Sequence, residues 1–341
     1  MGVPPVHIAI SRRPFVRLRF DAINAYSRRM STTPTDGNEI VPVIGHVVHP
    51  SDFSEASRRA FAYALKTALI GKGKLSLIHE TEDEKRDWSE FPGVRETLAR
   101  WGILAAGSPP EALDHLGIEV EKIIGSGSDP VAGVLNYLNQ HGADLIVLAT
   151  QHHGFNWLRK SVAEPVARKS GEMTLFVPAT GRGFISEEDG TVSLHRILIP
   201  IAETPSSYPA IVATARLLRQ LKCERGHVTL LHVGEDEPVV ETPRVEGWGW
   251  RQVRKSGNVI DVILETAQRE ETDLIVMSTD GRNGFLDAVR GSHSERVLRQ
   301  AECPLLAIPE SSTGAKEMTK AEKKDWYRER QKPARKRATG G

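Results

Sequence analysis

Residues 143–150 read ADLIVLAT and residues 272–279 read TDLIVMST, so one pattern occurs twice, 129 residues apart (272 minus 143). Each copy is a short apolar run led by an aspartate. The pattern VAGVLNYLNQHG precedes the first copy and VIDVILETAQREE precedes the second, and both are helical in period. A helix followed by a short apolar run is typical of a buried strand in a parallel sheet. The chain is therefore predicted to contain a repeated α/β unit.

A second pair of matching segments fixes the start of each unit. VVHPSDFSEAS (47–57) aligns with ILIPIAETPSS (197–207) at an offset of 150 residues, and each reads as a strand, a proline and a cap-rich turn into a helix. The two offsets differ by 150 minus 129, or 21 residues. The second unit is therefore predicted to lack about one helix between its second and fourth strands.

Strands and helices alternate throughout, which predicts an open parallel sheet covered on both faces. The expected strands lie around 43–49, 74–79, 118–124, 144–149 and 173–177 in the first unit, and around 195–201, 227–233, 249–254, 273–278 and 304–308 in the second. The predicted fold class is α/β, with two doubly wound, Rossmann-like five-stranded sheets that form a pseudo-dimer. The predicted domains are 41–180 and 192–310.

The composition is that of an ordinary globular protein. The 341 residues include 45 Lys and Arg against 44 Asp and Glu, so the net charge of +1 gives no global field that attracts nucleic acid or an anionic membrane. The two cysteines, Cys223 and Cys303, form neither a disulfide framework nor a zinc motif, which favours a cytoplasmic location. No apolar run reaches the ~18 residues that a membrane helix needs.

Both ends of the chain differ from the middle. Residues 1–40 begin with an arginine-rich, acid-poor stretch, which is either a targeting segment or an extension upstream of a translation start at Met30. Both interpretations stay open. The basic tail, 311–341, is predicted to be disordered.

A glycine-containing loop follows the fourth predicted strand of the second unit, in STDGRNGFLDAVRGSHSERVLRQ (278–300). Gly281 and Gly291 are separated by nine residues, and Ser292 stands where a helix is expected to open. Glycines let backbone N–H groups approach a polyphosphate closely, and a helix start offers free amides and the positive end of a dipole. The loop is therefore a candidate phosphate site.

Residues 277–309, MSTDGRNGFLDAVRGSHSERVLRQAECPLLAIP, resemble the carboxyl-terminal signature of universal stress proteins, and the resemblance extends over roughly residues 41–310. The family pattern is Gly, two residues, Gly, nine residues, Gly and then Ser or Thr. In this sequence Ser278 replaces the first glycine, while Gly281, Gly291 and Ser292 match the rest. The resemblance also implies that the fifth strands, the last of them CPLLAIP, pair the two domains edge to edge.

The resemblance implies binding of ATP or another adenine nucleotide, with Mg²⁺ if it is bound, and an aspartate near the nucleoside at the end of the first strand. Asp52 is that aspartate in the first unit, but there the loop reads ATQHHGFNWLRKSVAEP (149–165), is two residues shorter and keeps only Ser161. The residues Ala149, His152 and Lys160 stand where the glycines would be. In the second unit the aspartate position is Ala202, so neither unit holds the full set.

The predicted nucleotide site therefore consists of Pro200, Ser278, Gly281, Gly291 and Ser292, with Asp52 assigned to the first unit. No catalytic motif and no metal site is predicted. The leading hypothesis is a stress-response regulator that binds an adenine nucleotide in domain 2 without efficient turnover. The alternatives are a scaffold that binds no nucleotide and a slow ATP hydrolase. Intramolecular domain pairing is expected, a homodimer is left open, and neither a membrane nor a nucleic-acid partner is expected.

Overall fold

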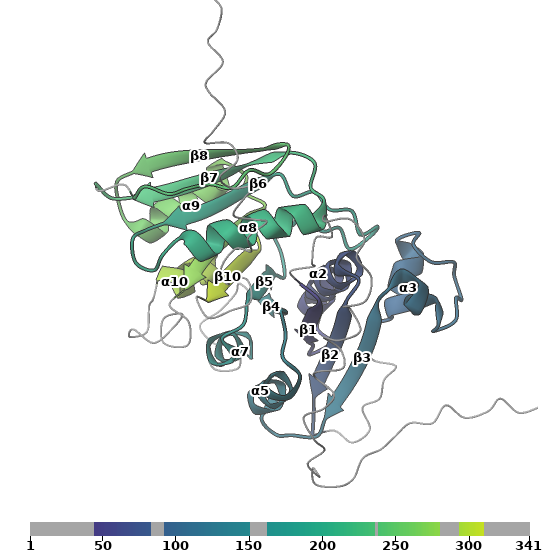
Figure 1. Ribbon diagram of the computed structural model, residues 1–341. Coiled ribbons are helices and arrows are strands. Elements are labelled where there is room, and N and C mark those ends of the chain that lie inside the picture. The colour runs from purple at the N-terminus through teal and green to yellow at the C-terminus, as the bar shows by residue number, and fades with distance from the viewer. Residues whose placement is uncertain (1–43, 83–91, 151–161, 236–237, 280–292, 310–341) are drawn as a thin grey trace, which may run out of the picture. The chain divides into compact units, whose positions relative to one another are not determined.

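Ten strands form one continuous sheet in the order β3-β2-β1-β4-β5-β10-β9-β6-β7-β8 in the computed structural model (Figure 1). The structure describes residues 44–82, 92–150, 162–235, 238–279 and 293–309. The first five strands are β1 (His46–Pro50), β2 (Lys74–Glu80), β3 (Glu119–Gly125), β4 (Leu145–Thr150) and β5 (Thr174–Pro178). The other five are β6 (Arg196–Ile201), β7 (Gly226–Val233), β8 (Trp248–Lys255), β9 (Leu274–Thr279) and β10 (Leu305–Pro309).

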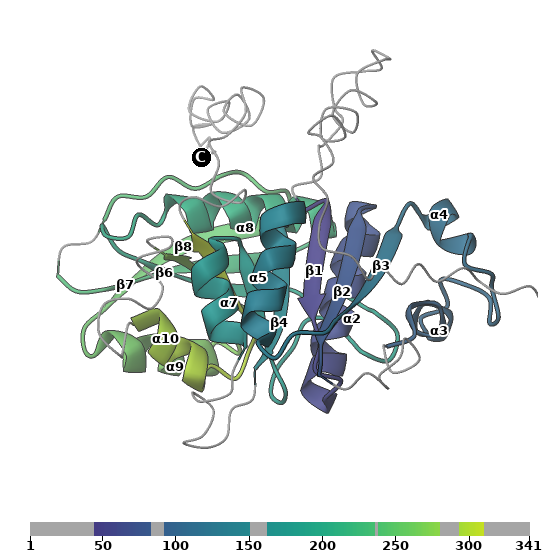
Figure 2. The same cartoon turned by 90° about the horizontal axis from the view of Figure 1, so that it is seen from below.

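Helices cover both faces of the sheet (Figure 2). On one face lie α2 (Glu55–Gly71), α3 (Val94–Arg100), α4 (Ala112–Leu116) and α8 (Tyr208–Leu221). On the other face lie α5 (Pro130–His141), α7 (Ala163–Ser170), α9 (Val259–Arg269) and α10 (His293–Gln300). Each face has its own apolar core cluster, and each cluster includes residues from both halves of the chain. None of the described helices is long and apolar enough to cross a membrane.

The two halves meet at an antiparallel pair of strands. Leu305 of β10 lies opposite Phe176 of β5, and Ala307 lies opposite Thr174. All other neighbouring strands of the sheet are parallel. The strand order is β3-β2-β1-β4-β5 in the first half and β10-β9-β6-β7-β8 in the second, so the two halves have the same topology in opposite directions. The predicted α/β class and the pseudo-dimeric pairing are confirmed, and the two five-stranded sets are joined into one sheet. The predicted domain boundaries stay a prediction, and residues 1–40 and 311–341 lie outside the described residues.

The repeated aspartate at the start of the fourth strand has a structural role in both halves. Asp144 Oδ2 accepts hydrogen bonds from the backbone N–H groups of Gly45 and His46, at 2.9 Å each. Asp273 Oδ2 does the same for His195 and Arg196, at 2.9 and 2.8 Å. A carboxylate that accepts two N–H bonds ties the first strand of the half to the fourth at their amino ends.

The halves differ between their second and fourth strands, where the first half contains α3 and α4. In the second half no helix appears among the described residues that connect β7 to β8. Trp248 and Trp250 point to the α8 face of β8 instead, and Val240 and Val245 from the connection pack against the same core. The two indoles and the loop thus fill the space that helices occupy in the first half.

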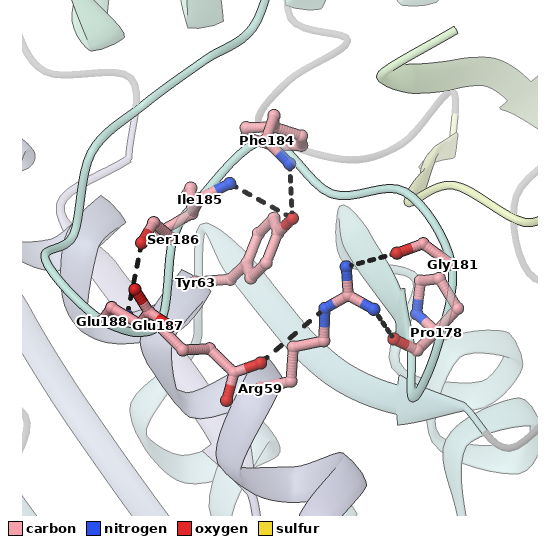
Figure 3. A network of polar contacts seen from close by, with 9 residues as sticks. All are labelled: Arg59, Tyr63, Pro178, Gly181, Phe184, Ile185, Ser186, Glu187 and Glu188. Carbon is pink, nitrogen blue, oxygen red and sulfur yellow. Dashed lines mark hydrogen bonds and ion pairs between the residues drawn. The ribbon is translucent and has the colours of Figure 1, made fainter. Parts of the chain in front are cut away.

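Residues 179–195 connect β5 to β6 and are called the strap below. Arg59 of α2 donates from Nη1 to the carbonyl of Pro178 and from Nη2 to that of Gly181, both at 3.0 Å. The hydroxyl of Tyr63, one turn further along α2, accepts from the N–H groups of Phe184 at 2.7 Å and Ile185 at 3.3 Å. Figure 3 shows both side chains reaching from α2 to the strap. The strap is therefore an ordered part of the fold.

Candidate functional site

The carboxyl ends of β6 and β9 form the place where the second half can bind a ligand. β6 lies between β7 and β9, and β9 lies between β6 and β10, so the connections leave these two neighbouring strands in opposite directions. In doubly wound sheets this reversal opens a crevice at the carboxyl ends of the strands, and ligands bind there. The glycine-containing segment from Gly281 to Ser292 follows the end of β9 in the sequence.

Two of the predicted site residues lie at this edge. Pro200 is the second-last residue of β6 and pairs in register with Leu231 of β7. Ser278 is the second-last residue of β9 and pairs with Ile308 of β10. The structure therefore brings Pro200 and Ser278 to the ends of adjacent strands. Gly281, Gly291 and Ser292 lie outside the described residues.

The hydroxyl of Ser278 is committed to helix α8. Its Oγ accepts a hydrogen bond from the backbone N–H of Ala210 at 3.1 Å, and the serine is buried. Ala210 belongs to the first turn of α8, where backbone N–H groups have no partner inside the helix. The serine that replaces the family's first glycine thus caps α8, a role that the sequence pattern did not reveal.

The ends of β1 and β6 show how the loss of the aspartate is accommodated. In the first half Ser57 Oγ accepts from the N–H of Asp52 at 3.3 Å and donates to its carboxylate at 2.6 Å. In the second half Ser207 Oγ accepts from the N–H of Ala202 at 3.0 Å and donates to the Ala202 carbonyl at 3.1 Å. The turn is preserved, but the second half offers no carboxylate at this position.

Asp52 itself is exposed and lies in the turn between β1 and α2. Partial burial alone would raise the pKa of its carboxyl, but hydrogen bonds from Ser54 and Ser57 hold the pKa below its usual value. β1 and β6 are separated in the sheet by β4, β5, β10 and β9. Five strand spacings of about 4.8 Å put these strands about 24 Å apart, so Asp52 cannot complete a site at the end of β6.

Glu80, which is not among the predicted site residues, adds a carboxylate to the first half. Glu80 ends β2 and turns toward Gly125 and Gly133, where an added Cβ would overlap its carboxylate. Burial raises the pKa of Glu80. Ile78 of β2 lies opposite Pro50, and Leu231 of β7 lies opposite Pro200, so Ile78 and Leu231 are equivalent positions. Glu80 follows Ile78 by two residues, so the equivalent residue of β7 is Val233. The two glycines, Gly125 and Gly133, can be read from the sequence, but only the structure shows that the Glu80 carboxylate occupies the space beside them.

Comparison with known proteins shows the family. The model of the universal stress protein family matches residues 44–178 and 246–309, which together are more than half of the chain. The chain belongs to the universal stress protein family. The matched regions of this universal stress protein include Pro50 and Asp52 in the first region and Ser278 in the second, whereas β6 with Pro200 lies between the two regions.

Curated relatives of this universal stress protein match over short stretches. A universal stress protein of Methanocaldococcus jannaschii is 44% identical over 46 residues, which are 14% of this chain and 27% of the relative. A universal stress protein A homolog of Coxiella burnetii is 40% identical over 58 residues, which are 17% of this chain and 40% of the relative. The chain thus spans less than half the length of either relative in these matches.

The fold extends over more of the chain than these sequence matches. The crystal structure of a universal stress protein from Archaeoglobus fulgidus superposes with a TM-score of 0.53, at 18% identity, over 79% of this chain and 98% of that one. This likeness shows that the whole ten-stranded arrangement, and not one half alone, resembles a solved universal stress protein. Among the described residues no group of three or more His, Cys, Asp or Glu could hold a metal ion.

Proposed function

We propose that this universal stress protein binds one adenine nucleotide, in its second half, and acts as a regulator without turning the nucleotide over efficiently. The observation that carries the proposal is that β9 ends at the reversal point of the sheet and is followed in the sequence by the glycine-containing segment from Gly281 to Ser292. Backbone N–H groups in such a loop and the start of the following helix suit a polyphosphate. The family resemblance supplies the adenine nucleotide as the ligand class.

The departures from the family pattern weaken this site without removing it. Ala202 removes one carboxylate contact, and the hydroxyl of Ser278 is already bonded to Ala210. A hydrogen bond contributes on the order of 1 kcal/mol, so losing one or two contacts lowers affinity by about fivefold to thirtyfold. We therefore propose binding in the micromolar to millimolar range rather than none.

The first half is proposed to bind no nucleotide. His152 and Lys160 replace glycines in its loop, and a side chain at such a position prevents close approach of the backbone to phosphate. Glu80 adds a carboxylate at the end of β2, where the second half has Val233, and this carboxylate repels a polyphosphate. The two halves thus differ in both shape and charge.

A titration of ATP with Mg²⁺ into the full chain, followed by calorimetry, tests the proposal. We expect saturable binding that Gly291→Lys abolishes, because this change copies the first half's own lysine into the loop. The matched change Ser161→Ala, in the degenerate loop, should leave binding intact. No binding at millimolar ATP would favour the scaffold alternative, and phosphate release that Gly291→Lys abolishes would favour a slow hydrolase.

A further inference from the structure

A large cavity in the first half lies between α2, α3 and the strap, away from the crevice proposed for the nucleotide. Its volume is about 990 Å³, which suits a molecule of drug size or larger. The described residues that line it are Ser51, Phe53, Arg58, Phe61, Ala62, Pro92, Gly93, Thr97, Arg100, Glu187 and Glu188. None of these is itself a residue of the predicted nucleotide site, and Ser51 and Phe53 flank Asp52 of the first half.

Helical spacing explains why these residues face one another. Arg58, Phe61 and Ala62 are three and four residues apart on α2 and share one face, as Thr97 and Arg100 do on α3. Phe61 and Ala62 are buried and form the apolar part of the floor between the two helices, and the buried Thr97 lies beside them. Arginines therefore stand at the rim on both helices, above an apolar floor.

The strap closes the cavity on a third side. Trp101, next to Arg100, donates from Nε1 to the carbonyl of Glu187 at 3.1 Å. Lys66 of α2 lies over the Trp101 ring, 5.7 Å from its centre. The strap position is held from α2 by Arg59 and Tyr63, as Figure 3 shows. These contacts make the strap a fixed wall, so the cavity is a built feature rather than a gap beside a loose loop.

The charges around the rim indicate the kind of ligand. The guanidinium groups of Arg58 and Arg100 form no ion pair or hydrogen bond with the described residues, and both side chains are exposed. Glu187 is directed toward Arg59, with 3.9 Å between its carboxylate and Nε. Two arginines that have no partner among the described residues, above an apolar floor, suit one anionic group on an apolar body. The carboxylates of Glu187 and Glu188 oppose a ligand with many negative charges, such as a triphosphate.

The two halves of the chain differ at the face of the sheet where this cavity lies. The second half has no counterpart of α3, and Trp248, Trp250 and Val245 fill the corresponding face of its sheet. Among the described residues, the wall that α3 gives this cavity therefore has no counterpart in the second half. The insert that distinguishes the first half is what builds one side of this cavity.

We propose that this cavity is a second ligand site, which binds an elongated apolar molecule carrying a single carboxylate, of the kind represented by a medium-chain fatty acid. The apolar chain lies between α2 and α3, and the carboxylate lies between Arg58 and Arg100. Because the strap forms one wall and joins the two halves, the ligand contacts the connection between them. This site does not depend on nucleotide binding in the second half.

Fluorescence titration of a dansyl-labelled undecanoic acid into the full chain tests the site. We expect enhanced dansyl emission that decanoate reverses by competition and decanol, which has the same chain without the charge, does not. Replacing both arginines, Arg58→Ala with Arg100→Ala, should weaken the probe about tenfold, the effect of losing roughly one charge-assisted hydrogen bond. Arg225→Ala, at an exposed arginine of the second half, is the matched control and should leave affinity unchanged.

A second variant tests whether the probe binds inside the cavity rather than on the surface of the protein. Thr97→Phe adds a ring to the floor and should abolish probe binding while far-ultraviolet circular dichroism and the unfolding temperature confirm a folded chain. The proposal is overturned if the full chain gives no displaceable dansyl signal, if decanol competes as well as decanoate, or if the double arginine variant binds as tightly as the original chain. Loss of ATP binding alone would leave this site standing.

Discussion

At the scale of single residues, Ser278 shows how a position predicted for the site has a role in the fold. The matching helix of the first half, α2, begins at Glu55, and the offset of 150 residues would place the start of α8 at residue 205. α8 begins at Tyr208 instead, three residues later. The N–H of Ala210 therefore falls in the first turn and needs an external acceptor, which Ser278 provides.

Removing this acceptor should destabilise the chain. We expect Ser278→Ala to lower the free energy of unfolding by about 1 kcal/mol, the usual cost of losing a helix-capping hydroxyl. The measurement is urea unfolding followed by circular dichroism. The reverse change in the first half, Ala149→Ser, is the control and should give no gain, because α2 begins earlier and its corresponding amide lies inside the helix. Equal stability of Ser278→Ala and the original chain would contradict the capping role.

Residue roles were only partly predictable from the sequence. The repeated pattern singled out Asp144 and Asp273, but their hydrogen bonds reach backbone amides 98 or 99 and 77 or 78 residues away, which no local pattern encodes. Pro200 and Ser278 were predicted from the motif, and the structure places both at the ends of adjacent strands. Their contact with a nucleotide stays a prediction.

At the scale of elements, the strands were predictable to within about three residues, because buried parallel strands are short apolar runs bounded by polar turns. The missing helix of the second half followed from the difference of offsets. The strap did not follow from any pattern, since its order depends on Arg59 and Tyr63, which are more than 115 residues away in the chain. Side-chain contacts at such a separation leave no periodic signal.

The strap gives a stability prediction for Tyr63. We expect Tyr63→Phe to lower the free energy of unfolding by about 1–3 kcal/mol, because two buried N–H groups, of Phe184 and Ile185, lose their acceptor. It should also speed proteolysis within residues 179–195. Tyr208→Phe, at an exposed tyrosine, should have a smaller effect. Unchanged stability and unchanged cleavage of the Tyr63 variant would show that the hydroxyl does not hold the strap.

The same tyrosine adds a dependence on alkaline pH. Burial raises the pKa of Tyr63 above its usual value of 10.0. The unfolded chain therefore loses this proton first as pH rises, so the contribution of Tyr63 to stability is complete below pH 10 and declines above it. In the Tyr63→Phe variant this part of the decline should be missing.

At the scale of the whole molecule, two similar halves of one sheet keep different residues of the family pattern. The antiparallel pair of β5 and β10 joins them through Phe176 and Leu305, and Gln220 of α8 also bonds both backbone groups of Ile44. The second half keeps the glycine loop and lacks the aspartate. The first half keeps the aspartate and builds a separate cavity. The distance between β1 and β6 prevents the two incomplete sets from forming one site.

The number of nucleotides bound per chain tests this account most directly. Native mass spectrometry of the 37.6 kDa chain with ATP and Mg²⁺ should show a single added nucleotide per chain, and the Gly291→Lys variant should show none. Two nucleotides per chain, or one nucleotide that survives Gly291→Lys, would contradict the assignment of nucleotide binding to the second half alone.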